Sequence, residues 1–450
     1  MGKGAAAYLI NENLSRTIQW ADEKFHLFAD RLKDPLSYGN GHAFHFSAKD
    51  NLCSTEFQTR AGSKILEGYR PPFDATAIAR LRQAGGLLVG KTAMDEFGFG
   101  SFGTNSASVI PRNPFDTSRS CGGSSSGAAA TASVLKDHLA LGVSTGGSIS
   151  CPASFCGVIG FTPTYGRVSR WGLIDFGSSL DKIGLLSSSS DLVRKYFPII
   201  AGPDPLDPTS QAQPPLDMGG DIKVVAIPEE SLTNLSDEVR SSFEEALTIL
   251  EDMGMEIRHI SMPSLRFALP AYYFLSTAEA STNLARYCGM RIGVLNDNIN
   301  QSFNDFFSQT RSQEFGDEAK RRILLGTFSR MVGFRDQYYL KALQVRQRII
   351  HEYEKEFRSA DAVLTPTMPF VAPRFEEIAH MSPLQLYQAD ALTVPPNLAG
   401  LPHLSLPCGY PGGLPVGMQI AAPHWMEGRL LELADRWGKT FQYRRPEMKA

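Results

Sequence analysis

Two glycine- and serine-rich stretches contain the side chains best suited to chemistry. They read CGGSSSG at residues 121–127 and STGGSIS at residues 144–150. Glycine lets backbone amides approach a substrate closely, and a serine hydroxyl beside such amides can attack a carbonyl carbon. Ser148, directly after two glycines, is therefore a candidate nucleophile.

Two other interpretations of these stretches were weighed. A flexible linker would lack regularly spaced apolar residues, whereas 128–135 can form a helix and 139–143 a short buried strand. A phosphate-binding loop would show the pattern GxxxxGK[ST], which is absent, and the nearby Lys136 follows the helical stretch. The pattern favours two ordered loops and nucleophilic catalysis.

A serine nucleophile needs a base, and no GxSxG turn with ordered Asp and His partners accompanies Ser148. Lys49 is the alternative, because it ends the alternating run AFHFSAK at 43–49, whose strand pattern brings it to the end of a sheet. A lysine in such a place is usually just exposed to solvent. The two Gly/Ser loops make it a candidate base.

Together these residues resemble the amidase-signature family, which has a Ser–Ser–Lys triad. Its lysine lies in a KDN-like motif, its bridging serine in GGSSGG and its nucleophile in a GGSI-like loop. The resemblance implies that the triad here is Lys49, Ser124 and Ser148, with the second serine 24 positions after the first as in the family. Longer segments resemble the A subunits of tRNA-dependent amidotransferases: AGSKILEGYRPPFDATAIARL, GLLVGKTAMDEFGFGS, PASFCGVIGFTPTYGRVSRWGLIDFGSSLDKIG and VPPNLAGLPHLSLPCG.

The resemblance implies a proton relay. Lys49 acts as a base only when neutral, so burial must lower its pKa from about 10.4 in water. It would then accept a proton through Ser124 from Ser148, which attacks an amide carbonyl. Backbone amides of the second loop would stabilise the oxyanion. These amides belong to Thr145, Gly146 and Gly147.

Recognition of glutamine needs groups for a carboxylate and an ammonium. By resemblance, Arg322 in AKRRILLGTF would bind the carboxylate with two hydrogen bonds, and Asp390 in YQADALTVPP would pair with the ammonium. Tyr272 would line the pocket. From the residues alone, Arg321 and Arg322 are a solvated helix face with at most one pointing inward, since neighbours diverge by about 100°. Asp390 is equally a cap or turn residue.

The second loop departs from the family pattern at two positions. Ser144 and Ser150 stand where the family usually has Asp and Arg. Loss of one member of an ion pair would strand a buried charge, so the joint change indicates coupled replacement.

The elements that must position these loops alternate between strand and helix. Residues 77–81 show helical periodicity that stops at Gly85–Gly86 before the apolar run 87–89, and strand 222–227 precedes a helix from Ser236 and a strand at 255–260. Strand, helix, strand predicts an α/β fold with a central mixed β-sheet flanked by helices on both faces. Residues 265–355 are predicted to be mainly helical.

We expect a single large amidase-signature domain over residues 1–450. Its parts are a shortened N-terminal helical region at 1–40, a catalytic core at 41–202, a proline-rich surface connection at 203–217, and the remaining sheet and helices with the pocket residues at 218–450.

Composition narrows the classes of function. With 42% hydrophobic residues, 20% charged residues and a net charge of −3, the chain is typical of globular proteins and has no strongly basic character for nucleic acid. Its six cysteines form no CxxC pairs, which indicates a reducing compartment and no structural metal site. The apolar run Ala5–Ile10 is too short to span a membrane.

The expected function is that of a glutaminase subunit that passes ammonia to a partner. By resemblance, the partners are a small third subunit of C-type or fungal F-type and an amidotransferase B subunit. The chain would bind no cofactor, while the B subunit would use ATP and Mg²⁺ and hold most of the Glu-tRNA(Gln). The short N-terminus suggests a mitochondrial protein, with a bacterial cytoplasmic one as the alternative. A free-standing amidase and a weakly active scaffold subunit are the other functions considered.

Overall fold

The computed structural model describes residues 12–33, 42–295 and 300–447. Within these ranges the strands form one sheet in the order β1-β3-β2-β4-β6-β5-β10-β11-β9-β7-β8. The strands are β1 (Phe28–Arg31), β2 (Phe44–Lys49), β3 (Gly86–Thr92), β4 (Leu139–Ser144), β5 (Ile159–Thr162), β6 (Lys182–Ser187), β7 (Val224–Pro228), β8 (Glu256–Ile260), β9 (Ala362–Pro366), β10 (His403–Gly409) and β11 (Val416–Ala421).

The sheet is mixed, as predicted. Strand β2 pairs in parallel with both β3 and β4, and β7 pairs in parallel with β8 and β9. The central strands from β4 to β9 are joined by antiparallel pairings. The three parallel strands β2, β3 and β4 end at the same edge, and this edge receives both the KDN motif and the second Gly/Ser loop.

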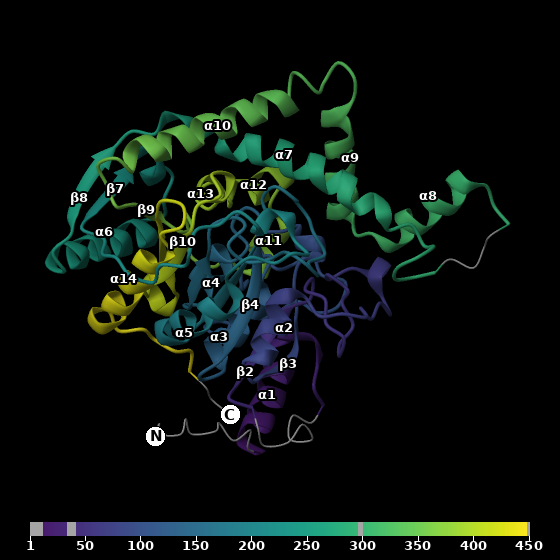
Figure 1. The fold of residues 1–450 in the computed structure, drawn as a ribbon, viewed down its shortest axis with the longest axis horizontal. Coiled ribbons are helices and arrows are strands. Elements are labelled where there is room, and N and C mark those ends of the chain that lie inside the picture. Colours follow the sequence, from purple (N-terminus) through teal and green to yellow (C-terminus); the bar gives the residue numbers. More distant parts are fainter. Residues whose placement is uncertain (1–11, 34–41, 296–299, 448–450) are drawn as a thin grey trace.

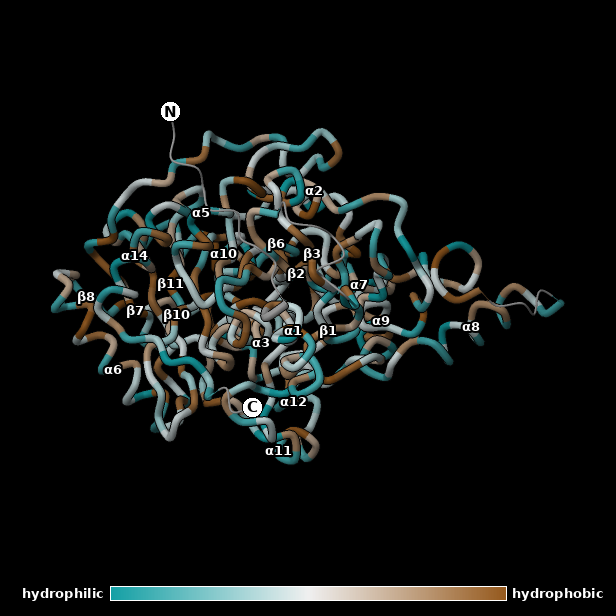
Figure 2. The backbone as a smooth tube through the Cα atoms, turned by 90° about the horizontal axis from the view of Figure 1, so that it is seen from below, coloured by the Kyte–Doolittle hydropathy of each residue, from teal (hydrophilic) through white to brown (hydrophobic). Residues whose placement is uncertain are grey.

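The helices are α1 (Glu12–Phe25), α2 (Thr76–Gln83), α3 (Ser126–Val134), α4 (Ser150–Phe155), α5 (Ser190–Ile200), α6 (Asp237–Asp252), α7 (Ala268–Asn283), α8 (Phe303–Glu314), α9 (Asp317–Arg330), α10 (Tyr339–Glu356), α11 (Phe375–Ala379), α12 (Pro383–Gln388), α13 (Val394–Leu398) and α14 (Glu427–Thr440). Helices α7, α9 and α10 form a layer above the sheet in Figure 1, with α8 beyond one end of the body, as Figure 2 also shows. The prediction that 265–355 is mainly helical is confirmed.

Helices cover both faces of the sheet. Two neighbouring residues of β5 show this, because each contacts a different helix. Gly160 faces Ala153 of α4, whereas the ring of Phe161 packs edge-on against Phe197 of α5 with centroids 4.8 Å apart. Successive strand residues point to opposite faces, so α4 and α5 lie on opposite sides. The predicted α/β architecture is confirmed.

Local sequence explains the element ends. Ser236 caps α6, because its Oγ accepts the N–H of Val239 at 3.4 Å, and the helix stops before Gly254, which has φ +87°. The predicted helix before Gly85 is α2, and the predicted apolar run after it is the fully buried β3.

The proposed divisions of the chain stay predictions, and the structure describes parts of two of them. The N-terminal region contains α1, while the apolar run Ala5–Ile10 lies outside the described residues. The proline-rich connection 203–217 has one short 3-10 turn, Pro208–Ser210, in which Ser210 is buried. No described helix combines the length and the apolar character that a membrane crossing needs.

Candidate active site

Lys49 is the last residue of β2 and is enclosed by the protein. Its side chain is 1% exposed, and Nζ donates hydrogen bonds to Ser124 Oγ at 2.7 Å and to the carbonyl oxygen of Val143 at 3.0 Å. Strand β2 lies between β3 and β4, so the lysine emerges at the centre of the parallel edge. The structure therefore brings together two of the three residues proposed as a triad.

Burial lowers the pKa of Lys49 from 10.5 to about 7, because a charged ammonium loses its hydration there. The carboxylates of Asp95 and Asp181 oppose this shift. Burial also raises the pKa of Asp95 to about 6 and that of Asp181 to about 7. At neutral pH a substantial fraction of Lys49 is uncharged and able to accept a proton.

Ser124 lies in the loop before α3, and the Gly123–Ser124 peptide bond is cis. The N–H of Gly123 donates to the carbonyl oxygen of Ser101 at 2.8 Å, and the carbonyl oxygen of Ser124 accepts the N–H of Asp95 at 3.3 Å. The side chain of Ser124 is 1% exposed. Its hydroxyl is thus held inside the protein, facing Lys49.

Ser148 lies in the loop between β4 and α4. Its carbonyl oxygen accepts the N–H of Ser125 at 3.1 Å, which joins the two Gly/Ser loops next to Ser124. Ser148 is 8% exposed, more than Lys49 and Ser124 at 1% each. It is thus the most accessible of the three proposed triad members.

The glycines before Ser148 are needed for close packing. A methyl group at Gly146 would lie 2.5 Å from Tyr272 Cζ, and one at Gly147 would overlap the side chain of Thr393. In the described part of the chain, the backbone amides of Thr145, Gly146 and Gly147 donate to no other residue. They are available to a substrate oxygen, and Tyr272 lies against the same loop.

Asp181 holds the start of this loop. Its Oδ1 accepts a hydrogen bond from Thr145 Oγ1 at 2.7 Å, and its Oδ2 accepts the N–H groups of Phe176 and Gly177 at 2.8 and 3.0 Å. The carboxyl group is 1% exposed. It connects the loop to the segment before β6.

The two serines in place of the family's Asp and Arg are both fully buried. Ser144 Oγ donates to Asn397 Oδ1 at 3.3 Å. Ser150 Oγ has no hydrogen-bond partner in the parts of the chain described. Neutral side chains therefore occupy two buried positions where single charges would be costly.

Arg322, rather than Arg321, faces inward. Its side chain is 3% exposed against 42% for Arg321, and its Nε donates to Glu318 Oε1 at 2.8 Å. Four aromatic rings surround the guanidinium with centroids 5.2 to 5.7 Å from Cζ. These rings belong to Phe99, Phe176, Tyr273 and Tyr387.

Asp390 lies between α12 and α13, close to Arg322. Its Oδ2 accepts a hydrogen bond from Tyr273 Oη at 2.9 Å. Burial raises the pKa of this carboxyl, while Ser101, Tyr273 and the charge of Arg322 oppose the shift. The cationic Arg322 and the acidic Asp390 thus both lie against Tyr273. An amino-acid head group needs one group of each kind, a cation for its carboxylate and an acid for its ammonium.

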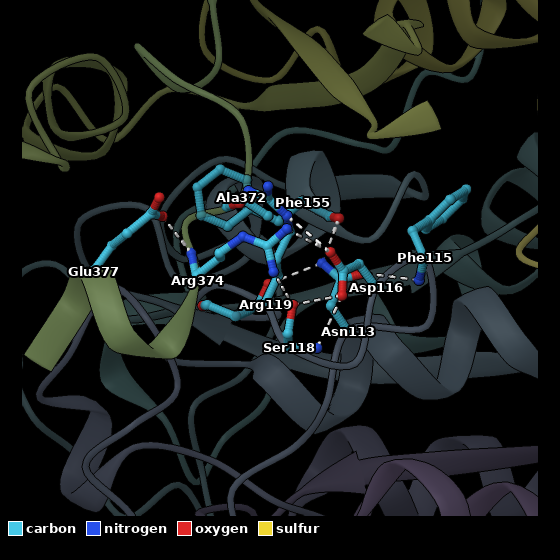
Figure 3. Close-up of polar contacts among 10 residues, drawn as sticks. Asn113, Phe115, Asp116, Ser118, Arg119, Phe155, Ala372, Arg374 and Glu377 are labelled. Carbon is cyan, nitrogen blue, oxygen red and sulfur yellow. Dashed lines mark hydrogen bonds and ion pairs between the residues drawn. The ribbon is translucent and has the colours of Figure 1, made fainter. Parts of the chain in front are cut away.

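A polar network fastens the segment that leads to Asp390 onto the loop that leads to Ser124 (Figure 3). Arg119 Nη1 donates to the carbonyl oxygen of Ala372 at 2.5 Å, and Arg374 Nη1 donates to Ser118 Oγ at 2.7 Å. These bonds bridge positions more than 250 residues apart in the chain. They hold the start of α11 against the segment 118–120, which leads into the first Gly/Ser loop.

Comparison with known proteins identifies the family of the chain. The amidase family model matches residues 42–431. The chain belongs to the amidase family. Its relatives include A subunits of glutamyl-tRNA(Gln) amidotransferases: that of Persephonella marina is 46% identical over 87% of this chain and 82% of that protein, and that of a Geobacillus strain is 42% identical over 96% and 91%. Among solved A subunits of this amidotransferase, the crystal structure from Thermotoga maritima superposes with a TM-score of 0.82, at 34% identity over 97% of this chain and 94% of that one.

Several residues around this candidate site were not predicted from the sequence. They are Asp95, Asp181, Tyr273, Glu318, Tyr387 and Thr393. Their only local signals were the tyrosine pair at 272–273 and the acid one helical turn before Arg322. In the described ranges no group of three or more His, Cys, Asp or Glu residues could hold a metal ion.

Proposed function

We propose that this chain is the glutaminase subunit of a tRNA-dependent amidotransferase, with Lys49, Ser124 and Ser148 as its catalytic residues. The single observation that carries the catalytic proposal is the 2.7 Å hydrogen bond from the buried Lys49 Nζ to Ser124 Oγ. A buried lysine with a pKa near 7 can serve as a base, and the backbone bond between Ser125 and Ser148 brings the nucleophile's loop beside it.

The proposed reaction begins with neutral Lys49. Ser148 Oγ attacks the side-chain amide carbon of glutamine while its proton passes through Ser124 to Lys49. The carbonyl oxygen becomes an oxyanion held by the backbone amides of residues 145–147. The proton returns to the amide nitrogen, the C–N bond breaks and ammonia leaves. Water then hydrolyses the acyl-enzyme by the same relay and releases glutamate.

The head group of glutamine has a proposed place beside this relay. Arg322 binds the α-carboxylate and Asp390 the α-ammonium, while Tyr272 lines the pocket against Gly146. The proximity of Arg322 and Asp390 around Tyr273 supports this assignment. A simple amide lacks both charges and would use neither anchor.

The ammonia is proposed to go to a partner protein. The relatives are A subunits of glutamyl-tRNA(Gln) amidotransferases, so we propose a B subunit that amidates Glu-tRNA(Gln) with ATP and Mg²⁺ and holds most of the tRNA. A small third subunit, of C-type or fungal F-type, completes the assembly. The net charge of −3 is consistent with a chain that leaves RNA binding to its partner.

The test is ammonia release from glutamine by the full-length chain, alone and with its partner subunits. Ser148→Ala should abolish the activity. Ser150→Ala, two residues away and without a hydrogen-bond partner in the described chain, should retain it. Full activity of Ser148→Ala would refute the nucleophile. Hydrolysis of simple amides without glutamine would indicate a free-standing amidase, and an inactive wild-type chain would indicate a scaffold subunit.

A further inference from the structure

The guanidinium of Arg322 is held by one edge only. Its Nε donates to Glu318 Oε1 at 2.8 Å, an i,i+4 pair on α9. Within the described residues, Nη1 and Nη2 of Arg322 donate no hydrogen bond. Neither nitrogen is completely buried. The outer fork of Arg322 is therefore open to a ligand, while its inner edge is occupied.

Glu318 is itself fixed from two further sides. Its Oε1 also accepts the hydroxyl of Tyr387 at 2.9 Å, and Arg321 Nη1 binds its Oε2. The carboxylate is 11% exposed. It has three donors and little freedom to rotate, so it constrains the orientation of Arg322.

Tyr387 extends this chain of contacts to the second anchor. Its ring stacks on that of Tyr273 with centroids 4.2 Å apart and planes 25° apart. Tyr273 Oη donates to Asp390 Oδ2 at 2.9 Å. An unbroken series of contacts thus joins the carboxylate anchor on α9 to the ammonium anchor after α12.

The edge at which Arg322 is held limits how a carboxylate can bind. A guanidinium offers a carboxylate either the pair Nε and Nη2 or the pair Nη1 and Nη2. Glu318 occupies Nε, so only the outer pair remains. The carboxylate must bind end-on, at a fixed place relative to Asp390.

A fixed head group makes chain length decisive. Glutamine and asparagine differ by one methylene, so the asparagine amide would fall short of Ser148 by roughly 1.5 Å, one C–C bond. A displacement of about 1 Å at the reacting atoms can cost on the order of a hundredfold in rate. A looser Arg322 would let the shorter amino acid shift towards the nucleophile.

We propose that Glu318 and Tyr387 are positioning residues that hold Arg322 end-on and at a set distance from Asp390, and that they thereby determine the preference for glutamine over asparagine. This inference rests on the proposed glutaminase function. A merely structural role of the Glu318–Arg322 pair would change stability without changing which amino acid is hydrolysed.

The experiment measures kcat and KM for glutamine, asparagine and butyramide with the full-length chain, alone and with its partner subunits. In Glu318→Ala we expect the glutamine KM to rise about tenfold with kcat within about threefold, and the glutamine-to-asparagine ratio of kcat/KM to fall about tenfold. Tyr387→Phe should raise the glutamine KM and lower the glutamine-to-asparagine ratio of kcat/KM, each by about threefold. Butyramide hydrolysis should not change.

Two further variants isolate the cause. Glu318→Gln should restore most of the discrimination, since its amide oxygen can still accept from Nε. Asp317→Ala, on the same helix with a 94% exposed carboxylate, should behave as wild type. If Glu318→Ala fails to fold, Tyr387→Phe decides the question, because it removes one of the contacts that hold Glu318.

An unchanged glutamine-to-asparagine ratio in folded Glu318→Ala and Tyr387→Phe would overturn the positioning role even if their melting temperatures fall. A wild-type chain that releases no ammonia from glutamine, alone or with partners, would instead refute the proposed function. The two failures are therefore distinguishable.

Discussion

Thr145 and Asp181 are hydrogen-bonded at 2.7 Å across the ends of two paired strands. Ser144 of β4 lies opposite Lys182 of β6, so Thr145 follows one member of the pair and Asp181 precedes the other. The antiparallel register alone makes them neighbours. The start of the proposed oxyanion loop is thus fixed to the sheet by a buried carboxyl group.

Loss of Asp181 should impair catalysis more than binding. In Asp181→Ala the loop loses its anchor, so we expect kcat for glutamine to fall about a hundredfold with a smaller change in KM. Asp175→Ala is the control, because Asp175 accepts from Ser178 and pairs with Arg286 away from the loop. Equal kcat values for the two variants would contradict the anchoring role.

The rate should depend on the protonation of Lys49. Its pKa is about 7 and only the neutral amine accepts a proton, so kcat/KM should fall about tenfold per pH unit below pH 7 and level off above pH 8. Stopped assays of ammonia from pH 5.5 to 9 measure this limb. Lys49→Arg should be inactive throughout, since a guanidinium stays protonated. A flat profile would exclude Lys49 as the base.

Asp95 should affect the pH at which kcat/KM falls on the acid side. Its negative charge raises the pKa of Lys49, so its removal in Asp95→Asn should lower this pKa and move the acid limb to lower pH. The same pH series measures the shift. A shift to higher pH would show that Asp95 does not stabilise the lysine ammonium.

Arg322 should contribute to the hydrolysis of glutamine but not to that of a simple amide. Arg322→Ala removes the carboxylate anchor, and we expect the glutamine KM to rise about a hundredfold while butyramide hydrolysis changes little. Arg321→Ala is the matched control, since this neighbouring side chain is 42% exposed. Equal losses of Arg322→Ala on both amides would refute the carboxylate role.

A buried histidine pair should make the protein acid-sensitive. The rings of His45 and His138 lie 5.0 Å apart, and burial lowers the pKa of His45 to about 4 and that of His138 below its usual value. The unfolded chain binds protons more readily, so stability is present above about pH 6.5 and is lost as the pH falls towards 4. Urea unfolding at pH 7, 5.5 and 4.5 measures this loss.

Replacement of one ring should reduce that sensitivity. His45→Phe should give a shallower decrease of the free energy of unfolding with falling pH, while His351→Gln should match wild type, because its side chain is 69% exposed. An unchanged slope in His45→Phe would place the acid sensitivity elsewhere.

Local patterns predicted the elements well. Helical spacing before Gly85, the helical pattern from Ser236 and the alternation in 43–49 depend on neighbours within a few residues, so α2, α6 and β2 were visible in the sequence. The same spacing showed that only one of Arg321 and Arg322 can face inward. Their burial confirms this geometry, with Arg322 inside.

Contacts between distant residues were not predictable in this way. Glu318, Tyr387 and Tyr273 come from three separate helices, and Asp181 is an ordinary acid in the sequence. The packing of helices and the pairing of strands decide which of them meet, and pair contacts of this kind leave no periodic trace in the sequence.

The sequence by itself determined the α/β class, the two ordered Gly/Ser loops and the spacing of Lys49, Ser124 and Ser148, because short-range propensity and motif spacing are written along the chain. The tertiary structure decided the burial that lowers the pKa of Lys49, the anchoring of Thr145 by Asp181 and the enclosure of Arg322. Desolvation and hydrogen bonding of these groups depend on what the whole fold packs around them.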